Sequence, residues 1–328
     1  MREDSIRVSL GTAIALGLIR GRMDAPPTTA YLLTPGGCHG ICKFCPQAST
    51  SAGRSDLLSR ITWPEFPVEQ VVAAIKQALD DFPGNKTGGA RKFQRACIQT
   101  VRNNRARVTI GHLLDELADL LPVSISWYPA NLEEIHELFS LGADRIGIAE
   151  DCPTDSLFRE IKGGSRTRIM ELLKHAACMY PGRIGTHLIV GLGESEREMV
   201  QAIQEVHDFG VTVGLFAFTP VPGTPLGSES PPDPCVYRRI QVARWLIVKN
   251  LRRAEQFIFD ENGRIVDWGM ANEDLVSILY SGKPFETSGC PGCNRPYYNE
   301  SPGGFMYNYP RPLTESEVRD ALNRLGFL

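Results

Sequence analysis

The stretch GGCHGICKFCPQ, residues 36–47, follows an apolar run, AYLL at residues 30–33, whose composition is typical of a β-strand. It places Cys38, Cys42 and Cys45 at C-x3-C-x2-C spacing between glycines and a proline, which predicts a loop at the end of that strand. Three thiolates can hold three irons of a 4Fe–4S cluster and leave the fourth without a protein ligand. Such an iron can chelate S-adenosylmethionine, whose reductive cleavage gives a 5′-deoxyadenosyl radical. The stretch therefore predicts a redox cofactor at a strand end.

Three other uses of these cysteines compete with the cluster. A structural zinc site needs a fourth ligand, and His39 follows Cys38 too closely to complete a tetrahedron easily. A disulfide framework fits poorly with nine cysteines, an odd number, and no secretory segment is expected. Buried thiols would not fall in a loop flanked by Gly and Pro. The cluster is favoured, and another metal site is the main alternative.

The composition is that of an ordinary globular protein. Of the 328 residues, 42% are hydrophobic and 22% are charged, so a full core can form. Lys and Arg number 35 against 38 Asp and Glu, a net charge of −3. This balance argues against a general nucleic-acid or membrane-surface binder.

Apolar strand-like runs alternate with segments of helical period from residue 28 onward, as in βα units around a parallel sheet. The predicted strands span residues 29–34, 93–101, 123–129, 145–151, 183–192, 212–220, 255–260 and 283–287. Helix starts with capping-box spacing are the pairs Asn131/Glu134, Ser195/Glu198 and Thr314/Glu317. Eight such units predict an α/β fold, a closed (β/α)8 barrel of TIM type, with its chemistry at the carboxyl ends of the strands.

Three segments are expected along the chain. Residues 1–27 would form a helical extension, because the apolar stretch 14–19 is too short to span a bilayer and lacks a small-residue cleavage site. Residues 28–288 would form the barrel, and residues 289–328 a tail that contains cysteines and a closing helix. Many cysteines without a signal peptide favour a reducing, cytoplasmic location.

The cysteine loop resembles the signature of the radical SAM superfamily in its spacing and in the aromatic residue before its last cysteine. Two later segments, HLIVGLGES at 187–195 and FTPVPGTPL at 218–226, are similar to segments of biotin synthase and its relatives. In that family the first segment lets the backbone approach the nucleoside of S-adenosylmethionine, which glycine permits. The resemblance implies cofactor contacts at Phe44, Gly191, Gly193 and Pro220. The alternative for the glycine segment is an ordinary βα turn.

The same resemblance implies two further contacts to the cofactor. The segment IAEDC, residues 148–152, stands where biotin synthase-like enzymes carry polar groups for the ribose hydroxyls. A carboxylate can accept two hydroxyl hydrogen bonds, so Glu150 is the candidate and Asp151 the alternate. Arg168 matches a family arginine that pairs with the methionine carboxylate, a contact that a guanidinium can make bidentate. Its alternative is a solvated helix arginine.

A second pair of cysteines lies in GCPGCNRPYYNE, residues 289–300. Cys290 and Cys293 follow the last predicted strand, so a second cluster is expected at the same mouth as the first. Two thiolates are too few to hold a cube, and the third ligand would be Cys97 or Cys152, both at predicted strand ends. Biotin synthase-like proteins use a cysteine resembling Cys97 for their sulfur-donating cluster, so Cys97 is preferred. The remaining cysteines, Cys178 and Cys235, are expected to pack on helices.

Residues 124–127, SISW, and 185–187, GTH, lack the cysteines that biotin synthase uses for its second cluster. With the C-terminal C-x2-C and the later YNYP at 307–310, the chain is most similar to one subunit of the archaeal-type, two-protein lipoyl synthase. That resemblance implies sulfur insertion into an octanoyl chain on a carrier-protein lysine, with a sacrificial second 4Fe–4S cluster. Residues 295–300 and 307–310 would wall the entry of that chain or close the barrel.

The lipoyl assignment implies several partners. They are an octanoylated carrier (H protein or a dehydrogenase E2 domain), a second radical SAM subunit and a low-potential electron donor, with neither nucleic acid nor membrane. One alternative is another radical SAM enzyme, of the biotin synthase or carbon-skeleton mutase kind, that acts on a small molecule. Another is an electron-transfer module, which would not need the nucleoside segments.

A basic tract surrounds the second predicted strand. It consists of Lys86, Arg91, Lys92, Arg95, Arg102, Arg105 and Arg107. Most such runs are solvated faces, but lipoyl carrier domains are typically acidic in what the family implies, so the tract could also dock a carrier.

Overall fold

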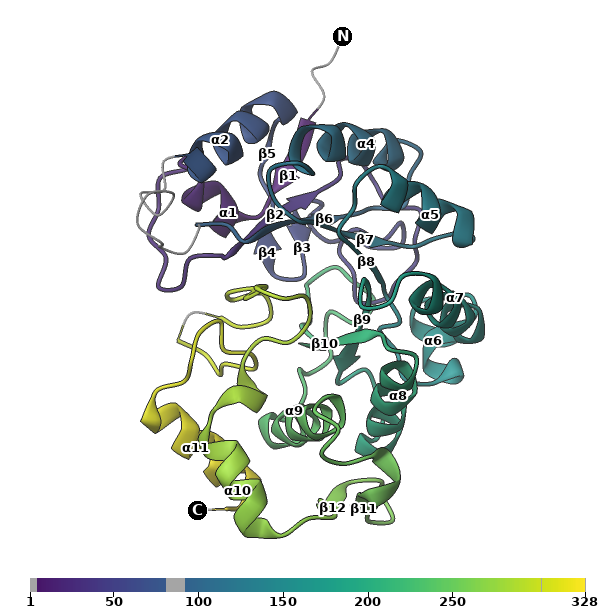
Figure 1. Ribbon diagram of the computed structural model, residues 1–328, viewed down its shortest axis with the longest axis vertical. Coiled ribbons are helices and arrows are strands. Elements are labelled where there is room, and N and C mark those ends of the chain that lie inside the picture. The colour runs from purple at the N-terminus through teal and green to yellow at the C-terminus, as the bar shows by residue number, and fades with distance from the viewer. Residues whose placement is uncertain (1–4, 81–91, 302, 328) are drawn as a thin grey trace. The chain divides into compact units, whose positions relative to one another are not determined.

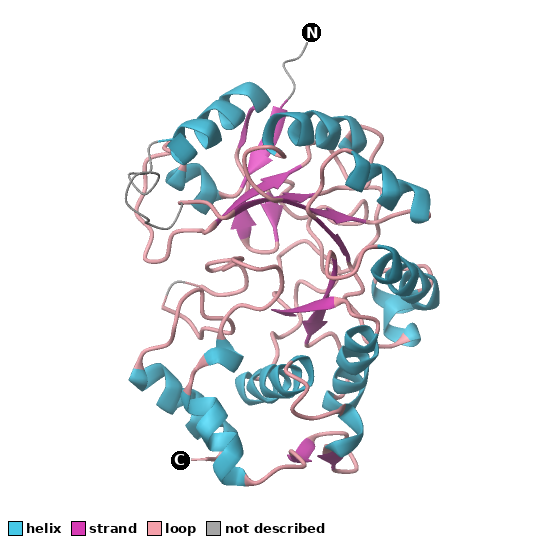
Figure 2. Ribbon diagram, viewed as in Figure 1, coloured by secondary structure: helices cyan, strands magenta, loops and turns pink. Residues whose placement is uncertain are grey.

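The computed structural model describes residues 5–80, 92–301 and 303–327. Its backbone contacts form two compact units. Unit 1 comprises Met1–Ala149, Val221–Ser228 and Cys290–Tyr298, and unit 2 comprises Glu150–Pro220, Glu229–Gly289 and Asn299–Leu328. Both consist of strands, helices and long loops, as Figures 1 and 2 show. Each unit is discontinuous in sequence, so this division does not test the three segments expected along the chain.

Unit 1 is a mostly parallel sheet flanked by helices (Figure 1). Its strands lie in the order β8-β7-β6-β2-β1-β5. The first four of these run parallel, and β1 pairs antiparallel with both β2 and β5. The elements are β1 Ser5–Val8, α1 Leu10–Ala15, β2 Thr29–Leu33, β3 Leu57–Leu58, β4 Ile61–Thr62, β5 Glu65–Pro67, α2 Val68–Asp80, β6 Arg95–Gln99, α4 Ala106–Leu117, β7 Val123–Trp127, α5 Leu132–Ser140 and β8 Arg145–Ile148.

Three side chains form one row across the sheet of unit 1. Tyr31 on β2 pairs in register with Cys97 on β6, and Cys97 pairs with Ser124 on β7. Residues paired directly on neighbouring strands point to the same face of a sheet, so these three side chains share one face. Within this row Tyr31 and Ser124 are buried, and Cys97 is partly exposed.

Unit 2 combines a parallel pair of strands with most of the longer helices of the C-terminal half (Figure 1). β9 and β10 pair in register from Gly185 with Thr212 to Val190 with Ala217. The elements are α6 Asp155–Ile161, α7 Arg166–Met179, β9 Ile184–Val190, α8 Glu196–Asp208, β10 Thr212–Ala217, α9 Pro234–Val248, η1 Ala254–Gln256, β11 Ile258–Phe259, β12 Ile265–Asp267, α10 Asn272–Tyr280, η2 Lys283–Phe285 and α11 Glu315–Leu325.

The predicted helix signals are confirmed where the structure describes them. The buried face of α2 consists of Val68, Val71, Val72 and Ile75. At the start of α5 the Asn131 side chain accepts the Glu134 N–H at 3.1 Å. The capping boxes predicted at Ser195 and Thr314 are both present, at the starts of α8 and α11. Local hydrogen bonds of this kind depend on residues close in sequence, which is why the sequence predicts them.

The last two predicted strands, 255–260 and 283–287, are wrong as barrel strands. The first becomes a 3-10 turn followed by the two-residue β11, which pairs antiparallel with β12 around Gly263 at φ +78°. The second becomes the 3-10 turn η2, where Pro284 has no N–H to donate to a neighbouring strand. The α/β class with parallel strands is confirmed, whereas closure into a TIM-type barrel is not shown.

The N-terminal region is not only helical. β1 is the inner antiparallel neighbour of β2, and the helix that follows it, α1, begins at Leu10 and ends at Ala15, before most of the predicted 14–19 stretch. Gly17 at φ +76° takes the chain out of the helix. Across the described residues, no helix has both the length and the apolar character that crossing a bilayer requires.

The part of the C-terminal tail from Asn299 onward belongs to unit 2 and contains little regular structure before α11 (Figure 2). Tyr307, Asn308 and Tyr309 are all buried. The buried Arg238 guanidinium donates to the Tyr307 carbonyl at 2.7 Å, and Glu300 Oε1 accepts the Asn308 N–H at 2.8 Å. Residues 307–309 therefore complete the core of unit 2, whereas their predicted roles at the entry of the substrate chain or in closing a barrel stay predictions.

Candidate metal and cofactor sites

The loop that carries Cys38, Cys42 and Cys45 lies in unit 1 directly after β2, as predicted, and all three side chains are partly exposed. The Cys38 sulfur accepts two backbone N–H groups, from Gly40 and Arg102, each at 3.3 Å. Amide donors of this kind stabilise an ionised sulfur, whether thiolate or metal ligand.

Backbone hydrogen bonds hold the cysteine loop at both ends. The His39 N–H donates to the Arg102 carbonyl at 2.8 Å, and the Ser49 N–H donates to the Gly40 carbonyl at 2.8 Å. The Asn103 side chain donates to the carbonyls of Pro35 and Gly37, both at 3.0 Å. The loop is therefore held by several hydrogen bonds that do not involve the cysteine side chains.

A buried arginine from β1 supports the same loop. The Arg7 guanidinium donates to the carbonyls of Thr34 at 2.9 Å, Gly36 at 3.2 Å and Ser55 at 2.8 Å, and to Gln47 Oε1 at 2.8 Å. Five donors in a fixed fork suit this task, because each carbonyl needs a separate N–H. Sequence reasoning missed Arg7, since nothing local marks an arginine whose partners lie far along the chain.

The first loop fits a cluster by its donor chemistry. In the described parts of the chain no three Cys, His, Asp or Glu side chains already surround a common point as metal ligands do. Three thiols on one anchored loop, with amide N–H groups aimed at one sulfur, nevertheless provide the donors that a 4Fe–4S cluster takes. Phe44 lies between the last two cysteines and is partly exposed; its cofactor contact stays a prediction.

A second thiol group, Cys97, Cys290 and Cys293, also lies in unit 1. Two hydrogen bonds fix the loop between Cys290 and Cys293. Arg95 Nε donates to the Pro291 carbonyl at 2.9 Å, and the Cys293 N–H donates to the Cys290 carbonyl at 3.1 Å. Gly292 adopts φ +74°, a left-handed conformation that favours glycine, and a Cβ there would also displace the Gln94 side chain.

The three thiols of the second group interact electrostatically. Burial raises the pKa of the Cys97 thiol, and the neighbouring Cys290 and Cys293 sulfurs raise it further. Burial likewise raises the pKa of Cys293, against the opposing charges of Arg295 and Arg95. A bound metal cation would compensate the charge of the buried Cys97 and Cys293 sulfurs on ionisation and so make them good ligands. The donor set therefore fits a thiolate-bound metal group.

Both thiol groups adjoin one apolar cluster. Tyr31, Leu33, Trp63 and Val101 form this buried cluster, and Cys38, Cys97 and Cys293 pack against it. Within unit 1, one sulfur of the first loop and two of the second group thus share a common wall. The sequence predicts that both thiol groups lie at the same end of the sheet. It does not predict which apolar residues form the wall beside them.

Of the two candidates for third ligand, Cys97 accompanies Cys290 and Cys293. Cys152, in unit 2, is fully buried, and its N–H donates to the Glu150 carbonyl at 2.8 Å. The contacts within unit 1 favour Cys97, and ligation by either residue stays a prediction. The predicted helix positions of the other two cysteines are confirmed, although Cys178 on α7 is exposed and does not pack in a core.

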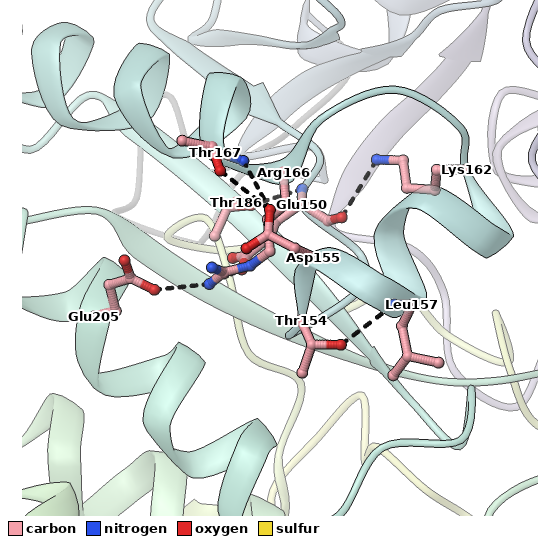
Figure 3. Close-up of polar contacts among 9 residues, drawn as sticks. All are labelled: Glu150, Thr154, Asp155, Leu157, Lys162, Arg166, Thr167, Thr186 and Glu205. Atoms are coloured by element: carbon pink, nitrogen blue, oxygen red, sulfur yellow. Dashed lines mark hydrogen bonds and ion pairs between the residues drawn. The ribbon is translucent and has the colours of Figure 1, made fainter.

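Glu150 is completely buried in unit 2 and already has a partner. Arg166 donates to Glu150 Oε1 through Nε at 2.8 Å, and its other arm reaches Glu205 at 2.7 Å (Figure 3). The arginine that approaches Glu150 is therefore Arg166, whereas Arg168 is exposed. Glu150 Oε2 is buried and has no hydrogen-bond partner among the described residues. The predicted roles of Glu150 and Arg168 toward the cofactor are untested.

Asp151, the alternate, is also buried and strained. Its φ of +62° lies in the left-handed region, which costs a non-glycine residue about 1 kcal/mol. Asp151 lies 2.7 Å from Lys162 Nζ and 2.8 Å from His187 Nε2. Burial alone would raise the pKa of Asp151, but Lys162 and His187 outweigh burial and hold it well below its usual range.

Glu150 gives a pH-dependent prediction. Burial raises its pKa to about 7 from an ordinary value of 4.5, although Arg166 opposes the shift. The folded state therefore binds this proton more tightly than the unfolded state, and stability from this group falls as the pH rises from 4.5 to 7. We expect the free energy of unfolding to be up to about 3 kcal/mol higher at pH 5 than at pH 8 on account of Glu150.

The measurement is urea unfolding at both pH values, with Glu150→Gln as the matched variant. The amide cannot titrate, so the difference between pH 5 and pH 8 should shrink in the variant. Equal differences in the two proteins would contradict the assignment of the shift to Glu150.

The predicted glycine turn after β9 is confirmed as a turn that needs glycine. Gly191 and Gly193 have φ of +101° and +113°, and a Cβ on Gly191 would approach Pro232 Cβ to 2.9 Å. The Glu194 carboxylate accepts the Gly191 N–H at 2.7 Å, a role that sequence reasoning missed. Pro220, after β10, is partly buried. Nucleoside contacts at these positions stay predictions.

The basic tract is not one exposed surface. Lys86 and Arg91 lie outside the described residues. Arg95 is buried and pairs with Asp144 at 3.1 Å, and Arg107 pairs with Glu137. Lys92 donates to the Ala15 carbonyl, whereas Arg102 and Arg105 are exposed. The tract as predicted is therefore partly structural.

Comparison with known proteins supports the superfamily. No protein-family model matches the chain. Over 241 residues, the chain is 27% identical to a biotin synthase from Alkalilimnicola ehrlichii, an alignment that covers 67% of this chain and 64% of that enzyme's length. The sequence similarity supports the radical SAM superfamily as the class of this protein. The chain spans less than two thirds of the curated relative it matches.

Solved structures share the fold at low sequence identity. The FeFe-hydrogenase maturase HydG from Carboxydothermus hydrogenoformans superposes with a TM-score of 0.51 at 13% identity, covering 80% of this chain and 68% of that protein. SuiB from Streptococcus suis, solved bound to S-adenosylmethionine, also gives a TM-score of 0.51 at 13% identity, covering 69% and 48%.

Proposed function

We propose that this chain is a radical SAM sulfurtransferase, one of the two subunits of a lipoyl synthase. It would insert sulfur into an octanoyl chain carried on a lysine of a carrier protein, either H protein or a dehydrogenase E2 domain. A second radical SAM subunit and a low-potential electron donor would complete the reaction. The observation that carries the proposal is the second thiol group, because a sulfur-inserting enzyme needs a sulfur source beside its radical source.

The residues of unit 1 divide between these two needs. Cys38, Cys42 and Cys45 would hold the cluster that, when bound, supplies the electron for reductive cleavage of S-adenosylmethionine. Cys97, Cys290 and Cys293 would hold the second, sacrificial cluster, whose sulfide is the source of the inserted atom. The shared apolar wall of Tyr31, Leu33, Trp63 and Val101 supports the proposal, since it excludes water beside both groups of thiols.

The test is mass spectrometry of an octanoyl-lysine peptide. The anaerobically reconstituted protein is incubated with the peptide, S-adenosylmethionine and a low-potential reductant. We expect the mass of one added sulfur atom, and lipoyl only when a partner subunit is added. The matched control is the Cys290→Ala/Cys293→Ala variant, which should still form 5′-deoxyadenosine but add no sulfur.

A second candidate rests on the sequence similarity to biotin synthase. In that case the chain would be a radical SAM enzyme of the biotin synthase or mutase kind that acts on a free small molecule. Consumption of desthiobiotin or of a free amino acid, with no sulfur added to the octanoyl peptide even beside a cognate partner, would favour this candidate and exclude the lipoyl proposal.

A further inference from the structure

Two hydroxyl groups flank the second thiol group in unit 1. Tyr31 Oη lies 3.3 Å from Cys293 Sγ, and Ser124 Oγ donates toward Cys290 Sγ at 3.8 Å. Tyr31 and Ser124 are 6% and 4% exposed, so neither hydroxyl can exchange its sulfur partner for bulk water. Both residues are also in register with Cys97, one on each neighbouring strand.

The proton of each hydroxyl has a defined direction. Tyr31 Oη accepts the backbone N–H of Arg295 at 2.8 Å, and Ser124 Oγ accepts a guanidinium N–H of Arg95. Each hydroxyl oxygen therefore already accepts one hydrogen bond from an N–H group. A metal-bound sulfur carries no proton and can only accept, so each hydroxyl must donate to its cysteine.

The groups that orient these hydroxyls are themselves fixed. Arg95 is held by Asp144 at 3.1 Å and by the Pro291 carbonyl at 2.9 Å. Arg295 has φ of +35°, an unusual conformation for a non-glycine residue, and this backbone directs its N–H to Tyr31. Strain of this kind persists only where the surrounding structure enforces it. The two donors are thus built into the fold and do not arise from mobile side chains.

We propose that Tyr31 and Ser124 are positioning residues that donate hydrogen bonds to Cys293 and Cys290 and so stabilise the reduced, more electron-rich state of the metal group bound by Cys97, Cys290 and Cys293. Hydrogen bonds to ligand sulfurs are among the factors that set the potential of an iron–sulfur cluster. The inference rests on the proposed second cluster but not on sulfur insertion or on the identity of the substrate.

The experiment uses the full chain with Cys38, Cys42 and Cys45 all changed to Ala, so that only the second group can bind iron. Tyr31→Phe keeps the ring against the apolar wall and removes only the hydroxyl. Ser124→Ala does the same for the serine, and Tyr280→Phe, exposed on α10, is the matched control. The fraction of reduced cluster is measured by electron paramagnetic resonance at a fixed applied potential.

We expect the ratio of reduced to oxidised cluster to fall about threefold to tenfold in Tyr31→Phe, the equivalent of one hydrogen bond, with unchanged iron content. Ser124→Ala should shift the ratio in the same direction by less, because its contact is longer. Unchanged ratios in both variants at equal iron content would overturn the inference.

A second measurement applies if a variant fails to assemble the iron–sulfur cluster. Cobalt(II) binding to the same thiols is followed by its sulfur-to-metal absorption, and Tyr31→Phe should weaken it about threefold to tenfold. Equal cobalt affinity in Tyr31→Phe and Tyr280→Phe would also overturn the inference. If the triple-alanine parent binds cobalt but no iron, the proposed second cluster fails, and the cobalt series still decides the role of the hydroxyls.

Discussion

Replacing Cys38, Cys42 and Cys45 together by Ala is expected to abolish reductive cleavage of S-adenosylmethionine. Formation of 5′-deoxyadenosine should fall to background, because these thiols are the proposed ligands of the cluster that delivers the electron. The measurement is chromatographic quantification of 5′-deoxyadenosine under anaerobic conditions with excess reductant. The matched control is Cys178→Ala, which removes an exposed thiol on α7 and should leave the rate unchanged.

The triple variant should remain folded, which makes its loss of activity interpretable. The three side chains are partly exposed, and the loop is held by Arg7, Asn103 and backbone hydrogen bonds that alanine leaves intact. Each substitution should therefore cost less than about 1 kcal/mol of stability. Persistent 5′-deoxyadenosine above background, in a variant with normal circular dichroism, would show that the loop does not bear the redox centre.

The parts of the fold that the sequence predicts are those that depend on local or periodic signals. The alternation of βα units locates β2, β6, β7, β8, β9 and β10, and the spacing Ser195/Glu198 marks the start of α8. The strand predicted at 283–287 is wrong although the sequence contains Pro284, which has no N–H to donate to a neighbouring strand. The strand β1 escapes prediction because its antiparallel pairing with β2 requires a chain reversal that no turn motif marks.

The candidate sites show the same division. Cys97 was associated with Cys290 and Cys293 through the resemblance to biotin synthase, although it lies at the middle of β6 and not at a strand end as predicted. Arg7, Tyr31 and Ser124 were missed because they act through partners far along the chain. Arg166 was not predicted, although it lies close to Arg168 in the sequence. Arg166 and Arg168 differ by two positions, which on a helix is a rotation of about 200°. Hence Arg166 faces the buried Glu150, and Arg168 faces solvent.

The second prediction of large effect concerns iron content. Anaerobically reconstituted wild-type protein should bind about eight irons per chain, and Cys290→Ala/Cys293→Ala should bind about four, since one of two clusters is lost. Colorimetric iron and sulfide determinations measure both values. Equal iron content in the wild type and the double variant would show that Cys290 and Cys293 do not hold a second cluster and have a structural role.

Single substitutions then separate the candidates for third ligand. Cys97 shares unit 1 with Cys290 and Cys293, and its sulfur interacts electrostatically with both, so Cys97→Ala should also lower the iron content to about four per chain. Cys152 is fully buried in unit 2, so Cys152→Ala should keep about eight irons and at most lose some stability through the small cavity. Cys235→Ala on α9 controls for the loss of any thiol. If Cys152→Ala, and not Cys97→Ala, loses four irons, the third ligand comes from unit 2, and the row of Tyr31, Cys97 and Ser124 has another purpose.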